Sequence, residues 1–279
     1  MVACRIVVAM VCLTVGLAAG VNAQKLTADQ IIEKHLSAIG DQQSRSLVKN
    51  AVLVGDASVK FVTAKTAEAG GRIAIATEGR KSFIGMNFNS LDYPQESILF
   101  DGSDVRIGSV RANNRSVLGN FLQSNDKIVS ESLFGGVLLQ SWGPLFAGEN
   151  KSRISLDGTK KIEGRETYAV SYSIKGAGGV KIKLYFDKES FRHVRTEYSA
   201  MFSAAIGRNP NESAGFSETR LRLTEDFTDF KAYSGVTLPM THVVNYSASG
   251  QNGTIEIEWR FAYTEIGFNQ QLAADTFGG

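Results

Sequence analysis

The stretch that decides the fold lies near the end of the chain, at residues 254–266 (TIEIEWRFAYTEI). Large apolar side chains alternate there with charged or polar ones. The apolar positions are Ile255, Ile257, Trp259, Phe261 and Tyr263, and the polar positions are Glu256, Glu258, Arg260 and Thr264. Because successive side chains of a β-strand point to opposite faces, the pattern predicts a long half-buried strand with a charged solvent face.

The same alternation recurs over most of the chain, between turn-forming residues. Further strands are predicted over residues 48–61, 72–77, 81–88, 97–100, 105–110, 167–174, 181–187, 191–198, 218–230 and 240–248. Gly55 and Asp56 predict a turn or bulge, residues 101–104 a hairpin turn, and residues 201–216 a long flexible loop. We therefore expect a mainly β fold, with a large curved antiparallel sheet around an apolar interior.

Residues 26–40 (LTADQIIEKHLSAIG) give the clearest helix signal. Thr27 and Gln30 have the spacing of a capping box, in which each side chain satisfies a backbone N–H group of the other residue. One apolar stripe runs along this segment: Ile31, Ile32, His35, Leu36 and Ile39. The helix is expected to end before Gly40 and to pack its stripe on the sheet.

The middle of the chain lacks strand alternation. Residues 116–122 and 127–139 are strongly apolar and are interrupted by Gly119, Gly135 and Gly136. Short amphipathic helices that cover one face or one opening of the sheet are the favoured interpretation. Two additional strands are the alternative.

The first 23 residues have the composition of a secretory signal. Arg5 precedes an apolar run from Ile6 to Ala19, and small residues lead up to Ala23, after which cleavage is expected. A transmembrane anchor is the alternative, but the run is shorter than the roughly 20 residues that a spanning helix needs. We expect export to the periplasm or beyond, a soluble mature chain with no membrane-spanning segment, and one domain over residues 24–279.

Composition narrows the class of partner. Both cysteines, Cys4 and Cys12, lie in the predicted signal, so the mature chain is expected to carry no disulfide. Lys and Arg number 30 and Asp and Glu 28, without a dense basic run, which argues against nucleic acid.

The sequence contains no recognised catalytic motif, and the three histidines lack metal-ligand spacing. We expect a non-enzymatic protein without a cofactor or metal, with an unrecognised hydrolase as the alternative. His242 is predicted to be a hydrogen-bonded wall residue. Glu225, Asp226 and Asp229 resemble a general acid–base group, but a solvated, salt-bridged face is the favoured interpretation.

The aromatic and aliphatic strand faces carry the functional hypothesis. A half-closed barrel with a small helical plug leaves an apolar groove that suits an acyl chain, whereas a filled interior is the alternative. The predicted walls are Tyr172, Leu184, Phe186, Val244, Tyr246, Ile257, Trp259 and Phe261, and the predicted lid residues are Phe121 and Phe134.

Five stretches carry a family resemblance. They are LTADQIIEKHLSAIG (26–40), LFDGSDVRI (99–107), LYFDKESFRHVRTEY (184–198), DFTDFKAYSGVTLPMTH (226–242) and IGFNQQLAADTF (266–277). Together with the order of signal, helix, strands, helical middle and strands, they resemble the superfamily of outer-membrane lipoprotein-sorting proteins, which includes LolA-like, LolB-like and RseB-like members.

The resemblance implies an unclosed antiparallel β-barrel with an N-terminal helix and a helical lid, whose apolar cavity holds lipid or lipoprotein acyl chains in the periplasm. It also implies an alternative role, that of an RseB-like envelope sensor or protein-interaction module without carrier activity. In that case the charged faces and the 201–216 loop matter more than the groove.

Overall fold

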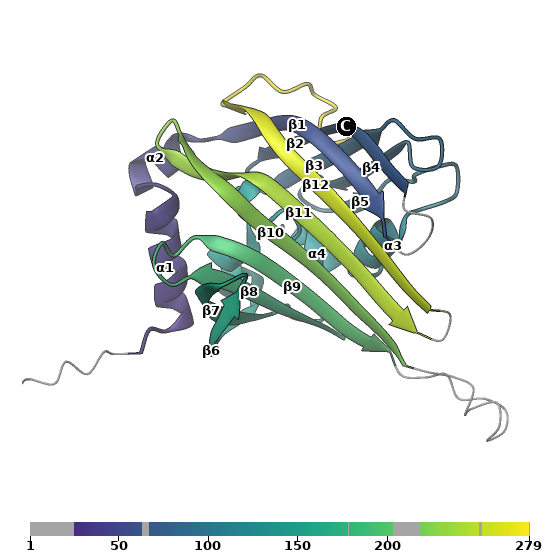
Figure 1. The fold of residues 1–279 in the computed structure, drawn as a ribbon. Helices are drawn as coiled ribbons and strands as arrows, with labels where there is room; N and C mark the ends of the chain where they lie inside the picture. Colours follow the sequence, from purple (N-terminus) through teal and green to yellow (C-terminus); the bar gives the residue numbers. More distant parts are fainter. Residues whose placement is uncertain (1–24, 63–66, 178, 203–217, 251–252, 279) are drawn as a thin grey trace, which may run out of the picture.

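A computed structural model describes residues 25–62, 67–177, 179–202, 218–250 and 253–278 (Figure 1). The predicted signal, and all of the predicted 201–216 loop except Met201 and Phe202, lie outside these residues. Within the described part, every strand belongs to one antiparallel sheet with the linear order β5-β4-β3-β2-β1-β12-β11-β10-β9-β8-β7-β6. Because β5 and β6 are its two edges, the sheet is not closed, and the predicted unclosed barrel is confirmed.

The strands follow the predicted alternation closely. They are β1 (Asn50–Phe61), β2 (Ala67–Glu78), β3 (Lys81–Phe88), β4 (Gln95–Phe100), β5 (Val105–Ile107), β6 (Arg153–Ile162), β7 (Arg165–Ser173), β8 (Val180–Asp187), β9 (His193–Phe202), β10 (Thr219–Tyr233), β11 (Val236–Gly250) and β12 (Gly253–Phe268). Strand β6 was not expected, because the alternation of Ile154 and Leu156 with exposed polar side chains is short and a bulge interrupts it between Leu156 and Gly158.

The pairing of β12 with β1 joins the two halves of the sheet. Trp259 lies opposite Val59, and the register shifts between Val54 and Gly55, so the predicted bulge is confirmed. A Cβ atom on Gly55 would lie 2.1 Å from the carbonyl oxygen of Ala262, which explains why glycine occupies this position.

The predicted first helix is α1 (Ala28–Ile39). Thr27 and Gln30 form both hydrogen bonds of the capping box, and the helix contacts β11 and β6 through its buried stripe. The short α2 (Gln42–Leu47) follows; it buries none of its side chains and therefore left no pattern in the sequence.

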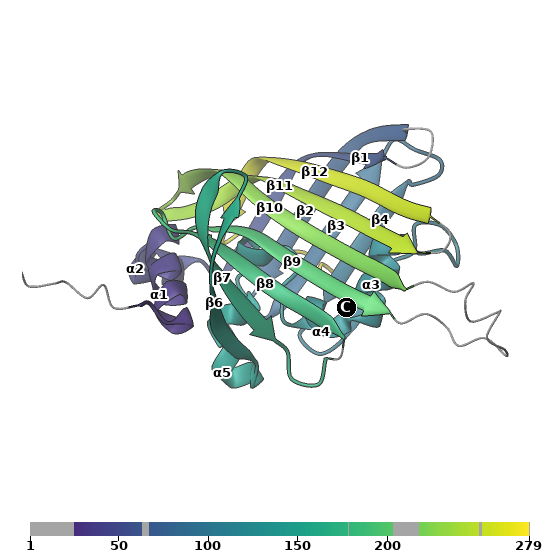
Figure 2. The same ribbon diagram turned by 60° about the horizontal axis from the view of Figure 1, so that its bottom comes forward.

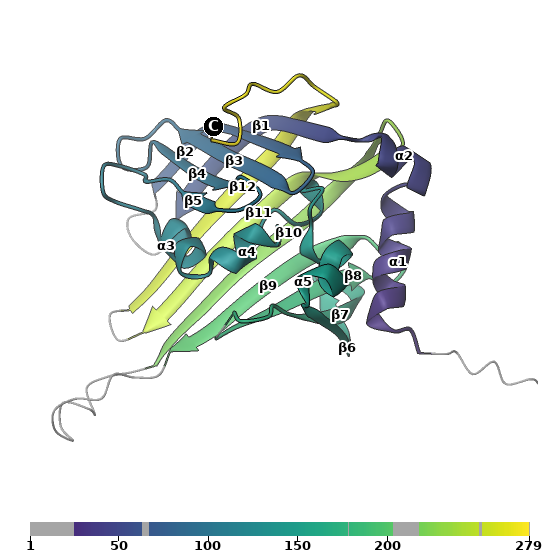
Figure 3. The same cartoon turned by 180° about the vertical axis from the view of Figure 1, so that it is seen from behind.

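The apolar middle of the chain forms short helices, so the alternative of two more strands is wrong. They are α3 (Val117–Ser124), α4 (Asp126–Ser130), η1 (Gly136–Leu138), η2 (Gly143–Phe146) and α5 (Ala147–Asn150). Figure 3 shows α3 and α4 inside the curve of the sheet, with α1 at one end of it. We call the segment Val117–Asn150 the plug.

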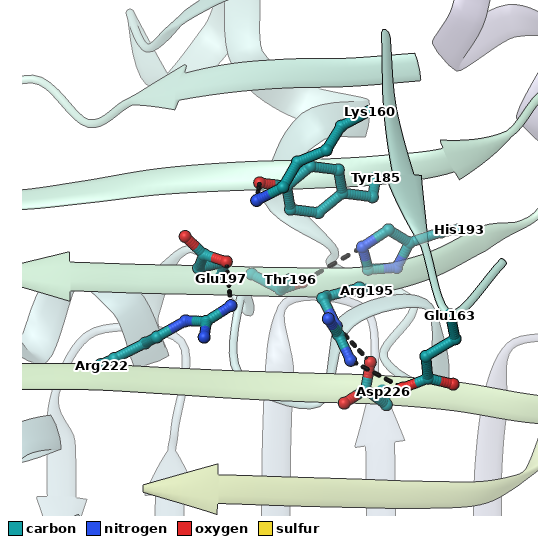
Figure 4. A network of polar contacts seen from close by, with 9 residues as sticks. All are labelled: Lys160, Glu163, Tyr185, His193, Arg195, Thr196, Glu197, Arg222 and Asp226. Carbon is teal, nitrogen blue, oxygen red and sulfur yellow. Dashed lines mark hydrogen bonds and ion pairs between the residues drawn. The ribbon is translucent and has the colours of Figure 1, made fainter. Parts of the chain in front are cut away.

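The outer face of the sheet carries a second, smaller cluster. Tyr185 and Ile162 are buried there beneath charged side chains, and Lys160 lies over the ring of Tyr185. Figure 4 shows the adjoining ion pairs, in which Arg195 contacts both Glu163 and Asp226. Figure 2 views the sheet from a second side and shows β6 and β7 lying beside β8 and β9. The predicted salt-bridged outer face is therefore present at Asp226.

Candidate functional site

All ten residues predicted to contact a ligand lie in the main core. Each is at most 7% exposed. They are Tyr172, Leu184, Phe186, Val244, Tyr246, Ile257, Trp259 and Phe261 on the sheet, and Phe121 and Phe134 on the plug. The ring of Phe121 packs against Tyr198 at 6.2 Å, and that of Phe134 against His242 at 6.3 Å. The plug thus covers the aromatic face, and a ligand role for these residues stays a prediction.

Glu225 fastens the plug to the sheet at a first point. Its carboxylate is fully buried and accepts hydrogen bonds from the Tyr198 hydroxyl at 2.8 Å and the Gly135 backbone N–H at 2.7 Å. His242 Nε2 lies 3.0 Å from the same carboxylate, which confirms the predicted hydrogen-bonded role of this histidine. Glu225 was expected on the solvated face. That expectation is wrong, because Glu225 points inward while its neighbour Asp226 points outward.

Glu96 on β4 provides a second point of attachment. It accepts hydrogen bonds from the hydroxyls of Tyr93 and of Ser116, the residue that caps α3. Burial raises the pKa of Glu96 although both hydrogen bonds act in the opposite direction. Trp259 Nε1 in turn donates to the Tyr93 hydroxyl at 3.1 Å. The largest side chain of the deciding strand is therefore held by this polar group.

Glu131 in the plug provides a third. The hydroxyl of Tyr172 on β7 donates to it at 2.5 Å, and that of Ser152 at 3.0 Å. Burial, together with the neighbouring carboxylate, raises the pKa of Tyr172. Because a buried polar group that loses its hydrogen-bond partner is strongly destabilising, these three attachments hold the plug on the aromatic face.

The three histidines lie inside the core rather than at a surface site. His193 packs between Trp142 and Phe227, and Phe227 stacks on His242 at 4.7 Å. Burial lowers the pKa of His35 to about 4, although a hydrogen bond with the carbonyl of Phe191 acts in the opposite direction. Burial also lowers the pKa of His193 well below its usual value. In the described part of the chain, no group of three or more His, Cys, Asp or Glu side chains is arranged to hold a metal.

A cavity of about 500 Å³ lies at the α1 end of the molecule, next to the η1 and η2 part of the plug. Its walls come from α1, the α2–β1 junction, the β2–β3 turn, η1, η2 and the adjoining ends of β11 and β12. The lining residues are Leu36, Ile39, Arg45, Val48, Lys49, Ala51, Gly79, Arg80, Val137, Leu138, Leu139, Gln140, Trp142, Leu145, Phe146, Val236, Leu238 and Phe268. None of the ten predicted contact residues is among them.

The lining is mostly apolar, with basic side chains at three positions. Leu36, Val48, Leu145, Phe146 and Phe268 are half-buried. The charged members are Arg45, Lys49 and Arg80, and the lining contains no carboxylate. An apolar cavity with a few polar groups is the usual form of a small-molecule site, and this volume lies within the roughly 300–1,000 Å³ that such sites span.

Sequence reasoning missed this cavity for a physical reason. Its walls are assembled from chain segments that are far apart in the sequence, and most of them are ends of strands or short 3₁₀ turns. Some lining residues belong to patterns that the sequence singled out, such as Leu36 and Ile39 in the apolar stripe of α1 and Val137 in the apolar middle, but no pattern indicates that they surround one space. No helix of the described chain has the length and apolar character to cross a bilayer.

No protein-family model and no curated protein matches this sequence. Solved structures with a similar fold include a LolA superfamily protein from Nitrosomonas europaea, 14% identical over 91% of this chain and 99% of that one, with a TM-score of 0.47. A putative outer membrane lipoprotein-sorting protein domain from Vibrio parahaemolyticus is 12% identical over 89% and 94%, with a TM-score of 0.46. A DUF1329 family protein from Desulfovibrio piger is 9% identical over 90% and 96%, with a TM-score of 0.47. The likeness to the LolA group concerns the fold alone.

Proposed function

We propose that the protein is an exported carrier that shelters an acyl chain of a lipid or lipoprotein in the cavity at the α1 end. The observation that carries the proposal is the cavity itself, a space of about 500 Å³ lined mainly by apolar side chains. Transfer of each methylene from water into such a space contributes about 0.8 kcal/mol. Roughly ten buried methylenes then contribute about 8 kcal/mol before the entropic cost of association.

Native mass spectrometry of protein purified from its own host tests this proposal. We expect co-purified lipid, and displacement of a fluorescent fatty acid from the delipidated protein. Val48→Trp places a large ring in the cavity wall and should weaken this binding at least tenfold. Leu91→Trp is the matched control, because Leu91 is 92% exposed and is not part of the cavity. A lipid-free mass without fatty-acid displacement contradicts carriage.

The residues predicted as walls on the aromatic face would contact a ligand only in a second step. An acyl chain longer than the cavity would reach residues such as Phe186 and Trp259 only if the plug left the sheet, since both are fully buried. That movement breaks the hydrogen bonds that Gly135 donates to Glu225, Ser116 to Glu96 and Tyr172 to Glu131. We therefore place the first ligand contacts in the cavity and propose the aromatic face as a secondary site.

Capture of an envelope protein is a second candidate function. It is favoured by exposed apolar side chains at one end of the sheet, where Phe202 ends β9 and Ile255 lies near the start of β12. They are 54% and 47% exposed, respectively. Cross-linking in envelope extracts separates the two functions. Replacing Phe202 and Ile255 by serine should abolish a specific cross-link without changing fatty-acid affinity, whereas Val48→Trp should do the reverse.

A further inference from the structure

We infer that the ligand of the α1-end cavity carries an anionic head group, a carboxylate or a phosphate, which Arg45, Lys49 and Arg80 bind at the cavity wall. The inference rests on the proposed acyl-chain function and specifies its ligand. It commits to a single-chain amphiphile with one negative end, and it excludes neutral and cationic amphiphiles as preferred ligands.

The three cations reach the cavity from two separate parts of the chain. Arg45 is in α2 and Lys49 immediately precedes β1, while Arg80 occupies the turn between β2 and β3. No sequence pattern brings these groups together; only the fold does. Their convergence on one apolar cavity, without a carboxylate in the lining, gives the site a single sign of charge.

Each cation keeps hydrogen-bonding capacity for a ligand. Among the described residues, none of the three forms an ion pair. The Arg45 Nε–H donates to the carbonyl of Gly40 at 3.0 Å, which orients the guanidinium and leaves its terminal nitrogens without a protein acceptor in the described chain. Lys49 Nζ donates to the Ser46 carbonyl at 2.8 Å and has two further N–H groups.

Arg80 is held in position by an aromatic ring. Its guanidinium lies 5.0 Å from the ring centre of Phe146, and its Nη2 donates to Asn150 Oδ1 at 3.2 Å. A guanidinium that is already fixed in this way loses little side-chain entropy when it binds an oxyanion, and it can do so through two parallel hydrogen bonds. Phe146 is half-buried and also lines the cavity. The same ring can therefore contact both Arg80 and the acyl chain of the ligand.

The other charged groups of this region do not neutralise the site. Glu78 and Glu149 are close to Arg80 and Phe146 in the sequence, but both are exposed and neither lines the cavity. Asp41 caps α2 through Ser44. Some cations elsewhere are paired with acids, as Arg72 is with Asp56 and Arg222 with Glu197. The distinctive feature of the cavity is that three cations meet at one apolar lining that contains no carboxylate.

Isothermal titration calorimetry with four compounds of equal chain length tests the inference on the delipidated full-length protein. The compounds are palmitate, hexadecyl phosphate, hexadecanol and hexadecyltrimethylammonium, each below its micellar concentration. We expect the two anions to bind at least tenfold more tightly than hexadecanol, and the cation to bind most weakly. The advantage of the anions should shrink between 50 mM and 500 mM salt, because screening weakens exposed charge interactions. The better of the two anions identifies the carboxylate or the phosphate as the natural head.

The double variant Lys49→Gln/Arg80→Gln should lower palmitate affinity about tenfold and leave hexadecanol affinity unchanged. Lys60→Gln/Lys181→Gln is the control, since both lysines are exposed and lie outside the cavity. Equal affinity for palmitate and hexadecanol, or an unchanged palmitate affinity in the double variant, overturns the inference while leaving acyl-chain binding intact. Failure of all four compounds to bind refutes the proposed function itself.

Discussion

The centre of the concave face and its α1 end are built from the same strands but serve different purposes. On β11, Val244 is fully buried under the plug, whereas Leu238, six residues earlier, lines the cavity. On β12, Trp259 is fully buried, whereas Phe268 is half-buried at the cavity wall. An apolar strand face therefore does not by itself mark a binding site. The position of the plug decides which part of that face is core and which part is cavity.

Truncation of Trp259 is the strongest test of the difference between the centre of the concave face and its α1 end. Trp259→Ala should lower the free energy of unfolding by about 3–5 kcal/mol, because it removes a fully buried ring and the partner of Tyr93. Ile255→Ala on the same strand, where the side chain is 47% exposed, should change it by less than about 1 kcal/mol. Urea unfolding measures both values.

The same variant separates the two proposed ligand positions. If the first ligand contacts lie in the α1-end cavity, folded Trp259→Ala protein should bind palmitate within about twofold of the wild-type affinity. A large loss of affinity in protein whose circular dichroism is native would instead place the acyl chain against the aromatic face.

A pair of leucines compares the two regions with one side-chain type. Leu184 is fully buried at the centre and Leu145 is half-buried at the cavity. Leu184→Ala should cost about 2–5 kcal/mol of stability and Leu145→Ala about 1 kcal/mol. The difference is expected because folding buries less apolar surface of Leu145 than of Leu184. Fatty-acid affinity should fall only for Leu145→Ala. Equal stability losses would show that the cavity wall is packed as tightly as the core.

Acid should weaken the centre of the molecule through its histidines. The folded-state pKa of His35 is about 4, below its usual 6.5, so between these pH values the unfolded chain binds a proton that the folded chain does not. Stability is therefore complete above pH 6.5 and falls as the pH drops towards 4. At pH 5 the loss is about 2 kcal/mol relative to pH 8 for this one histidine, and His193 acts in the same direction.

Urea unfolding between pH 8 and pH 5 measures this slope. In folded His35→Phe protein, the number of protons taken up on unfolding, which this slope reports, should be smaller by about one. A stability that is the same at pH 8 and pH 5 would show that the buried histidines accept protons without unfolding.

Much of this architecture could be predicted from periodicity, since period-two alternation reports which face of a strand is buried. That pattern predicted the β10–β11–β12 meander, its absence indicated the helical middle, and the turn-forming residues Gly55 and Asp56 indicated the bulge. It failed at the edge strand β6, where a bulge interrupts a short alternation, and at Glu225, where the buried side chain is an acid. A carboxylate looks the same in the sequence whether water or a tyrosine satisfies it.

The cavity could not be predicted in this way. Its volume depends on where the plug ends relative to the strands, and that is a property of turns such as the one at Gly135 and Gly136. Both have positive φ angles, and a Cβ atom on Gly136 would lie 2.8 Å from the ring of Phe227. This close approach sets the plug against the sheet at η1. The sequence shows the two glycines but does not indicate the cavity that their turn leaves at the α1 end.

The smallest expected effect concerns the helix that walls the cavity. The Thr27 hydroxyl accepts a hydrogen bond from the Gln30 backbone N–H at 3.2 Å in the capping box of α1. Thr27→Ala removes this box and should cost about 1 kcal/mol of stability. Ser37→Ala on the exposed side of the same helix is the control, because its hydroxyl donates only to the carbonyl of Glu33. Because the loss of one cap loosens mainly the first turn of a helix, hydrogen exchange should quicken in α1 while the amides of β8 and β9 keep their protection. Faster exchange across the whole sheet would mean that the cavity end and the centre unfold as one unit, and the contrast between the two regions would then hold for packing but not for stability.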